Sequence, residues 1–313
     1  MRSTMAKPAV VLIGADKGGV GKTTVSRTLL DYFLVHKIPT RVFDTEYPKG
    51  TLKRFHPEIT EVVDITSVPA QMKIFDTIYS SGTQITLLDI RAGTLSSTLR
   101  TLRDIGFLET ARRNQIIFAL FHILGPSIAS LDEIAETSKI LIEAQYFLVK
   151  NFINNTGFFD WDQATYNSYF KNLHHAGEIT IPKLNEMACE QVELASVPFA
   201  TFAAKTLKPE SSSFVLRGYV RHWLDNVFAE YDRVKLTDIV APKDAALKSV
   251  VVHNYTILDT KTAEPKLGPG KRTAEKIEQN KHTIVPGTAE AVDAHLIDDT
   301  GKYRPEWTKL LRH

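Results

Sequence analysis

The chain has 313 residues, of which 43% are hydrophobic and 24% are charged, a balance typical of a globular protein with a buried core. Its net charge of +2 argues against a uniformly basic nucleic-acid-binding protein but is compatible with a local basic patch. The single cysteine, Cys189, excludes a disulfide within the chain and argues against a thiolate-bound metal cluster. Such cysteine usage is typical of a reducing compartment, so we expect a cytoplasmic protein.

Strand and helix patterns alternate along the first 236 residues. Continuous apolar runs predict strands buried on both faces, and apolar residues at helical spacing predict helices. The expected strands lie at residues 9–13, 40–44, 61–65, 85–89, 115–121, 146–149 and 179–182. The expected helices begin at residue 22 and cover residues 69–79, 97–105, 128–142 and 214–231. This alternation predicts an α/β fold, a doubly wound and mostly parallel sheet with helices on both faces.

The character of the chain changes after residue 236. Glycine and proline are scattered there among charges of mixed sign, and residues 250–258 resemble a strand. We therefore predict one domain over residues 1–236 and a small, partly flexible C-terminal accessory segment over residues 237–313. No apolar run in the chain approaches the length of a membrane span, so contact with a membrane is not expected.

A glycine-rich loop joins the first predicted strand to the first predicted helix. A helix start offers unpaired backbone N–H groups and the positive end of the helix dipole, and glycines let that backbone curl around phosphate oxygens. In such a loop Lys22 reaches the β- and γ-phosphates, and the Thr23 hydroxyl binds Mg²⁺. The usual pattern has glycine at the position of Asp16, so this loop departs from it. The run is Lys17-Gly18-Gly19-Val20-Gly21-Lys22-Thr23-Thr24.

This run resembles the deviant phosphate loop of the ParA/MinD/ArsA group of ATPases. The resemblance implies ATP and Mg²⁺ as cofactors, an ATP-dependent homodimer, and slow ATP hydrolysis that a protein activator stimulates. It also implies that Lys17 reaches across the dimer to the nucleotide of the partner subunit. The loop positions that would hold the nucleotide are Gly18, Gly19, Val20, Gly21, Lys22, Thr23 and Thr24.

Two predicted strands end in aspartate. Asp44 matches the family position that orients the attacking water, although the loop after it departs from the family pattern at Glu46, Tyr47 and Lys49. Asp89 follows an apolar strand, which is the Walker B arrangement, and its carboxylate is expected to bind Mg²⁺. The alternative for either residue is an acidic side chain that caps a turn.

The resemblance also suggests residues for recognition of the base. The family places an asparagine after a late strand to contact adenine, and Asn151 fits that position. A second contact comes from a proline-containing segment after the next strand, for which Pro182 is the candidate. The alternative is that both residues only close strands. Cys189 lies on a predicted helix, where we expect it to face the core.

Three functions remain open from the sequence. The stretch from Arg41 to Phe55 resembles plasmid-mobilisation ATPases of the StbB and TraL type, which favours a nucleotide switch that positions plasmid or other DNA. The first alternative is a metabolic ATP-dependent enzyme of the dethiobiotin-synthetase or cobyrinate-amidase kind. The second is an adaptor that binds nucleotide and barely hydrolyses it. Several arginines are candidates for non-specific contacts with DNA phosphates, or else form solvated helix faces. They are Arg100, Arg103, Arg112, Arg113, Arg217, Arg221 and Arg233.

Overall fold

A seven-stranded sheet forms the centre of the protein, whose computed structural model describes residues 7–125, 129–141, 144–153, 176–204 and 213–242. The strand order is β3-β2-β4-β1-β5-β6-β7, and every pairing is parallel. The strands are β1 Ala9–Gly14, β2 Thr40–Asp44, β3 Thr60–Val62, β4 Ile85–Asp89, β5 Ile117–Ile123, β6 Gln145–Asn151 and β7 Ala176–Ile181.

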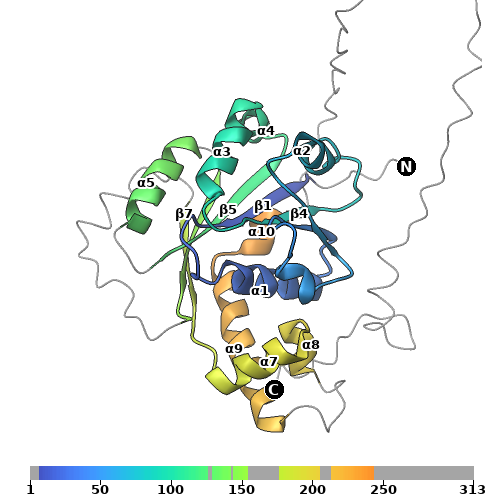
Figure 1. Ribbon diagram of the computed structural model, residues 1–313, viewed down its shortest axis with the longest axis vertical. Helices are drawn as coiled ribbons and strands as arrows, with labels where there is room; N and C mark the ends of the chain where they lie inside the picture. Colours follow the sequence, from blue (N-terminus) through green and yellow to red (C-terminus); the bar gives the residue numbers. More distant parts are fainter. Residues whose placement is uncertain (1–6, 126–128, 142–143, 154–175, 205–212, 243–313) are drawn as a thin grey trace, which may run out of the picture.

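Helices cover both faces of this sheet (Figure 1). One face carries α2 Val68–Phe75, α3 Leu95–Asp104, α4 Phe107–Arg112 and α5 Ala129–Ile140. The other carries α1 Lys22–Val35, α7 Glu186–Ala195, α8 Phe199–Ala203, α9 Phe214–Arg233 and α10 Leu236–Val240. A short 3₁₀ helix, η1 Leu52–Arg54, follows β2.

The central strand β1 shows why its sequence is apolar without a break. Val11 and Ile13 pack into the core beneath α1 and α7–α10, whereas Val10 and Leu12 pack into the core beneath α2–α5. Successive side chains of a strand point to opposite faces, so a strand covered on both sides needs an apolar residue at every position. All residues of β1 are buried.

The predicted α/β fold is confirmed, and the differences lie at the ends of elements. The third strand covers Thr60–Val62 and the fifth Ile117–Ile123, where residues 61–65 and 115–121 were expected. The short helices α4, α8 and α10 were not predicted, because a helix of five or six residues shows little periodicity. The expectation that Cys189 faces the core is wrong, since this residue lies on α7 with its side chain exposed.

Residues near the predicted domain boundary belong to the core. Leu236 and Val240 of α10 are fully buried in the cluster that also contains α9. Residues 243–313 lie outside the described part of the chain, and so does the strand expected at 250–258. The boundary after residue 236 therefore stays a prediction.

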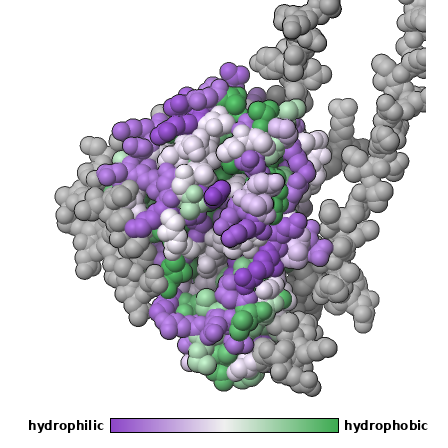
Figure 2. Space-filling view, viewed as in Figure 1, coloured by the Kyte–Doolittle hydropathy of each residue, from purple (hydrophilic) through white to green (hydrophobic). Residues whose placement is uncertain are grey.

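Helices α7 and α9 each leave apolar side chains in solvent. Figure 2 shows hydrophobic residues gathered at the lower end of the molecule, over these helices. The fully buried residues of α9 begin at Val220, and before it the half-buried Leu216 is the apolar residue that packs on the core. None of the described helices has the length and apolar character needed to cross a membrane. The exposed large hydrophobic residues here are Met187, Leu194, Phe214, Val215 and Tyr219.

The strand order also places a reversal of chain direction at the carboxyl ends of β1, β4 and β5. After β1 the chain enters α1 on one face, whereas after β4 and β5 it enters α3 and α5 on the other face. Loops that leave neighbouring parallel strands in opposite directions open a crevice at the carboxyl ends of those strands, where ligands bind in such folds. The glycine-rich loop after β1 lies at this position.

Candidate nucleotide-binding site

The loop between Gly14 and Lys22 has the backbone of a phosphate-binding turn. Gly19 and Gly21 adopt left-handed conformations, with φ of 72° and 84°, which glycine tolerates best. Gly21 is the N-cap of α1, and the described residues supply neither a side-chain cap nor an acidic residue in the first turn. The first N–H groups of this helix are therefore available to an anion.

Lys22 bridges the two ends of the loop. Its side chain is buried, and Nζ donates a hydrogen bond to the carbonyl oxygen of Lys17 at 2.9 Å. Burial lowers the pKa of Lys22, and the nearby carboxylates of Asp89, Glu133, Asp16 and Glu46 oppose that shift. The site therefore holds a positive charge, in a partly dry environment, close to the helix start.

Asp89 ends β4 next to this lysine. It is in register with Ile13 of β1 on one side and with Asp44 of β2 on the other. Burial, and secondly the charge of Asp44, raises the pKa of Asp89 to about 7, while the hydroxyls of Thr23 and Ser26 and the charge of Lys22 act in the opposite direction. The Oδ1 atom of Asp89 is buried without a hydrogen-bond partner.

This orphaned oxygen fits a magnesium site. Mg²⁺ is usually bound by one or two carboxylates together with substrate phosphates and water, rather than by a cage of protein ligands. The described residues contain no group of three or more His, Cys, Asp or Glu side chains that could hold a metal ion. Asp89 and the neighbouring Thr23 hydroxyl match the smaller set of ligands that Mg²⁺ needs beside a nucleotide.

Asp44 organises the loop that follows β2. Its Oδ1 accepts a hydrogen bond from the Glu46 N–H at 2.9 Å, and Oδ2 accepts from the N–H groups of Leu52 at 2.7 Å and Lys53 at 3.3 Å. Both carboxylate oxygens are thus bound to backbone amides that fold this loop back onto the strand. The role of Asp44 in orienting water stays a prediction.

Thr45 connects the loops after β2 and β4. Its N–H and its hydroxyl both donate to the Asp89 carbonyl oxygen at 3.0 Å, and the hydroxyl accepts from the Arg91 N–H at 2.8 Å. No sequence pattern points to this residue, because the contact depends on two strands that are distant in the chain. Thr45 keeps the two acidic strand ends together.

Asn151 supports the phosphate loop from the end of β6. Its Nδ2 donates to the carbonyl oxygens of Val20 at 3.1 Å and Gly21 at 3.3 Å, and the side chain is buried. Pro182 follows β7, and its carbonyl oxygen accepts a hydrogen bond from Trp223 Nε1 at 2.6 Å. The predicted contacts of Asn151 and Pro182 with adenine stay predictions.

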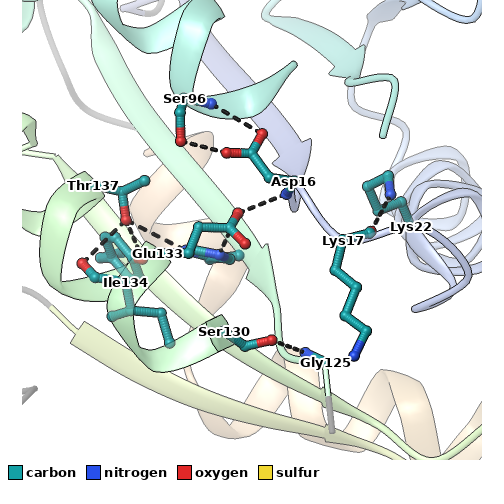
Figure 3. A network of polar contacts seen from close by, with 11 residues as sticks. Asp16, Lys17, Lys22, Ser96, Gly125, Ser130, Glu133, Ile134 and Thr137 are labelled. Atoms are coloured by element: carbon teal, nitrogen blue, oxygen red, sulfur yellow. Dashed lines mark hydrogen bonds and ion pairs between the residues drawn. The ribbon is translucent and has the colours of Figure 1, made fainter. Parts of the chain in front are cut away.

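Lys17 lies at the outer side of the loop, over the end of β5 (Figure 3). A Cβ atom added at Gly125 would come within 2.8 Å of Lys17 Cδ, so the lysine stem packs against the backbone of its own chain. The predicted contact of Lys17 with a partner's nucleotide stays a prediction. Some of the arginines considered for DNA contacts have acidic neighbours: Arg103 pairs with Asp104, and both Arg112 and Arg113 pair with Glu109.

Gly21→Ala is expected to disturb the loop more than Gly19→Ala. Both positions have a positive φ, which costs a residue with a Cβ atom about 1–2 kcal/mol. A Cβ at Gly21 would also lie 2.1 Å from Asn151 Nδ2, whereas a Cβ at Gly19 meets nothing within 4 Å. We expect the Gly21 variant to have the lower melting temperature, and Asn151→Ala to restore part of the loss. Equal melting temperatures of the two single variants would contradict this account.

Comparisons with known proteins give only weak similarities. No family model matches the sequence, and no curated protein matches it. A nucleotide-binding protein in complex with ADP from Archaeoglobus fulgidus superposes with a TM-score of 0.40 and 13% identity, over 60% of this chain and 86% of that one. The MinD cell division protein of Aquifex aeolicus superposes with a TM-score of 0.40 and 14% identity, over 69% of this chain and 95% of that one. A MinC:MinD complex from the same organism superposes with a TM-score of 0.38 and 15% identity, over 69% of this chain and 94% of that one. Such values show neither the family nor the activity of this chain, so its function has to be inferred from the site.

Proposed function

We propose that this protein is an ATP-dependent molecular switch that binds ATP with Mg²⁺, forms a homodimer and hydrolyses the nucleotide slowly. The observation that carries this proposal is the placement of Lys22 beside the orphaned Asp89 oxygen, at the start of a helix without a side-chain cap. A lysine and free amides suit the triphosphate, and a carboxylate with a hydroxyl suits its magnesium ion.

Each residue of the proposed site has a role that follows from its chemistry. The amides from Gly19 to Thr24 hold the phosphates, and Lys22 neutralises charge that develops on the γ-phosphoryl group. Thr23 and Asp89 would hold Mg²⁺, which when bound withdraws charge from the phosphate oxygens. Catalysis in such a site comes from positioning and electrostatics, because the side chains form no covalent bond with the substrate.

The hydrogen bonds that the Asp44 carboxylate accepts from its own loop support slow hydrolysis. Its two oxygens accept three backbone N–H groups of the loop at residues 46–53. A carboxylate has about four acceptor positions, so one remains on Oδ1 for a water molecule. Because Asp44 is buried, water reaches that position only after the loop moves, and a loop rearrangement of that kind would limit the rate. A protein partner that binds the loop would then act as the activator. The cargo that we propose is plasmid or other DNA, on the resemblance of residues 41–55.

The test of the switch is the oligomeric state with different nucleotides. We expect light scattering with size-exclusion chromatography to show a dimer with ATP and Mg²⁺, and a monomer with ADP or without nucleotide. A Lys17→Ala variant should still bind ATP but remain monomeric. A molecular mass that does not depend on nucleotide would contradict the switch, and ATP turnover that required a small-molecule acceptor would favour a metabolic synthetase.

A further inference from the structure

A partly buried polar network connects Asp16, near the start of the phosphate loop, to two helices on the face of the sheet opposite α1 (Figure 3). The Asp16 N–H donates to Glu133 Oε1 of α5 at 2.6 Å. The Asp16 carboxylate accepts from the Ser96 N–H of α3 at 3.2 Å and also from the Ser96 hydroxyl. One loop residue is therefore tied to α5 through its backbone and to α3 through its side chain.

Glu133 packs against a buried histidine of the core. Its Oε1 lies 3.0 Å from Nε2 of His122, which is fully buried on β5, although this nitrogen forms no hydrogen bond with the described residues. The other ring nitrogen of His122 contacts the Tyr146 hydroxyl, which lies 2.9 Å from the Thr137 hydroxyl. Polar groups in a dry interior are costly unless they bind one another, so the contacts among His122, Tyr146 and Thr137 fix the histidine against which Glu133 packs.

The network lies where β1 ends and the phosphate loop begins. His122 is in register with Gly14, the last residue of β1, two residues before Asp16. The Glu133 side chain is only 10% exposed, and the charges of Glu133 and Asp16 both act on Lys22. The aspartate that replaces the usual glycine of a phosphate loop thus has a structural partner on each neighbouring helix.

We infer that Asp16 and Glu133 are positioning residues, which fix the start of the phosphate loop and couple nucleotide binding to α3 and α5. This inference rests on the proposed nucleotide site. A loop that is already held in the conformation that binds ligand loses less conformational entropy on binding. Loss of the hydrogen bond to Glu133 or to Ser96 therefore weakens the affinity for nucleotide. Coupling is reciprocal, so bound nucleotide must also stabilise the start of α3. A partner that moves α3 or α5 would alter nucleotide affinity by the same route.

The first test uses Glu133→Ala, with Glu136→Ala as the matched control, because Glu136 is an exposed residue on the same helix. Hydrogen exchange of residues 15–24 is measured in the nucleotide-free protein. We expect exchange to become about 10-fold faster in the Glu133 variant, the effect of losing one charge-assisted hydrogen bond, and to stay unchanged in the control. Unchanged exchange in both variants would overturn the inference. This readout does not depend on ATP, so it separates failure of the anchor from failure of the proposed function.

The second test measures affinity for a fluorescent ATP analogue with Mg²⁺. Glu133→Ala should bind about 10-fold more weakly than wild type, and Glu133→Gln, which keeps an acceptor for the Asp16 N–H, should lose less. A purely structural role would lower the melting temperature of Glu133→Ala without this difference in affinity, and that result would overturn the inference.

The third test addresses the hydrogen bonds between the Asp16 carboxylate and Ser96 of α3, and it compares Ser96→Ala with Ser97→Ala. Ser97 is the neighbouring exposed residue, and its hydroxyl bonds only locally to the Thr94 carbonyl oxygen. We expect ATP to slow hydrogen exchange at residues 94–99 in wild type and in the Ser97 variant, and to slow it less in the Ser96 variant. An equal effect of ATP in all three proteins would contradict the coupling.

Discussion

Lys22→Ala is expected to weaken ATP binding by at least about 100-fold, because it removes the buried positive charge at the phosphate site. Nζ of Lys22 lies across the loop from the helix start, and no other lysine of the run is buried. A hydrogen bond to a charged group contributes about 1.5–3 kcal/mol, and this lysine is expected to make contacts with more than one phosphate. Titration with a fluorescent ATP analogue measures the loss.

The matched control for this prediction is Lys73→Ala. Lys73 forms an exposed ion pair with Glu61 on the far side of the sheet, and an exposed pair contributes little to stability. Circular dichroism spectra should show both variants folded. Affinity of the Lys22 variant within threefold of wild type would exclude this lysine from the phosphate site.

Asp89→Asn is expected to have opposite effects on the free and the nucleotide-bound protein. Without nucleotide and magnesium, the variant should be more stable than wild type at about pH 8, because it removes a buried carboxylate that has an unpaired oxygen. With ATP and Mg²⁺, wild type should gain stability and the variant should gain much less, because an amide is a poor substitute for a charged magnesium ligand. Urea unfolding under both conditions measures this crossover.

The pH dependence of the same variant follows from the pKa of Asp89. Burial is the first cause that raises this pKa from 3.8 to about 7 in the folded protein. Between these values the unfolded chain has released a proton that the folded chain still binds, so the free energy of unfolding falls as pH rises from about 4 to about 7. One pKa unit corresponds to about 1.4 kcal/mol, which makes the full loss on the order of 4 kcal/mol. Asparagine does not titrate, so its unfolding profile should be flatter.

Asp104→Asn serves as the control for Asp89→Asn, because Asp104 is an exposed carboxylate with an exposed arginine partner. It should follow the wild-type profile at every pH. If Asp89→Asn were less stable than wild type at about pH 8 without nucleotide, the buried carboxylate would not be the destabilising group that its unpaired oxygen indicates. If ATP and Mg²⁺ stabilised the variant as much as wild type, the assignment of Asp89 as a magnesium ligand would be wrong.

The sequence predicted the fold well, because each central strand is covered on both faces and is therefore apolar throughout. It also placed Lys22 at the start of the helix after β1 and Asp89 at the carboxyl end of β4, and these positions come together because the carboxyl ends of parallel strands lie on the same side of the sheet. Strand ends were less accurate: residues 115 and 116 precede β5 although Ile116 is apolar and buried. Burial alone does not show whether a residue pairs in the sheet.

The supporting contacts of the site could not be predicted in the same way. Glu133 meets the Asp16 N–H across 117 residues of sequence, and this contact depends on how α5 packs over the sheet. His122 reaches Glu133 only because β5 pairs with β1 at Gly14. The bonds from Asn151 to the loop carbonyls and from Asp44 to its own loop likewise depend on side-chain direction, which a pattern of residue types does not contain.

Isothermal titration calorimetry of the full chain with ATP, in the presence and absence of Mg²⁺, tests the central claim most directly. The loop geometry, Lys22 and the orphaned Asp89 oxygen predict saturable binding of one ATP per chain, tighter with magnesium than without it. Absence of any heat of binding under both conditions, even at the highest protein concentration that stays in solution, would contradict the assignment of a nucleotide site.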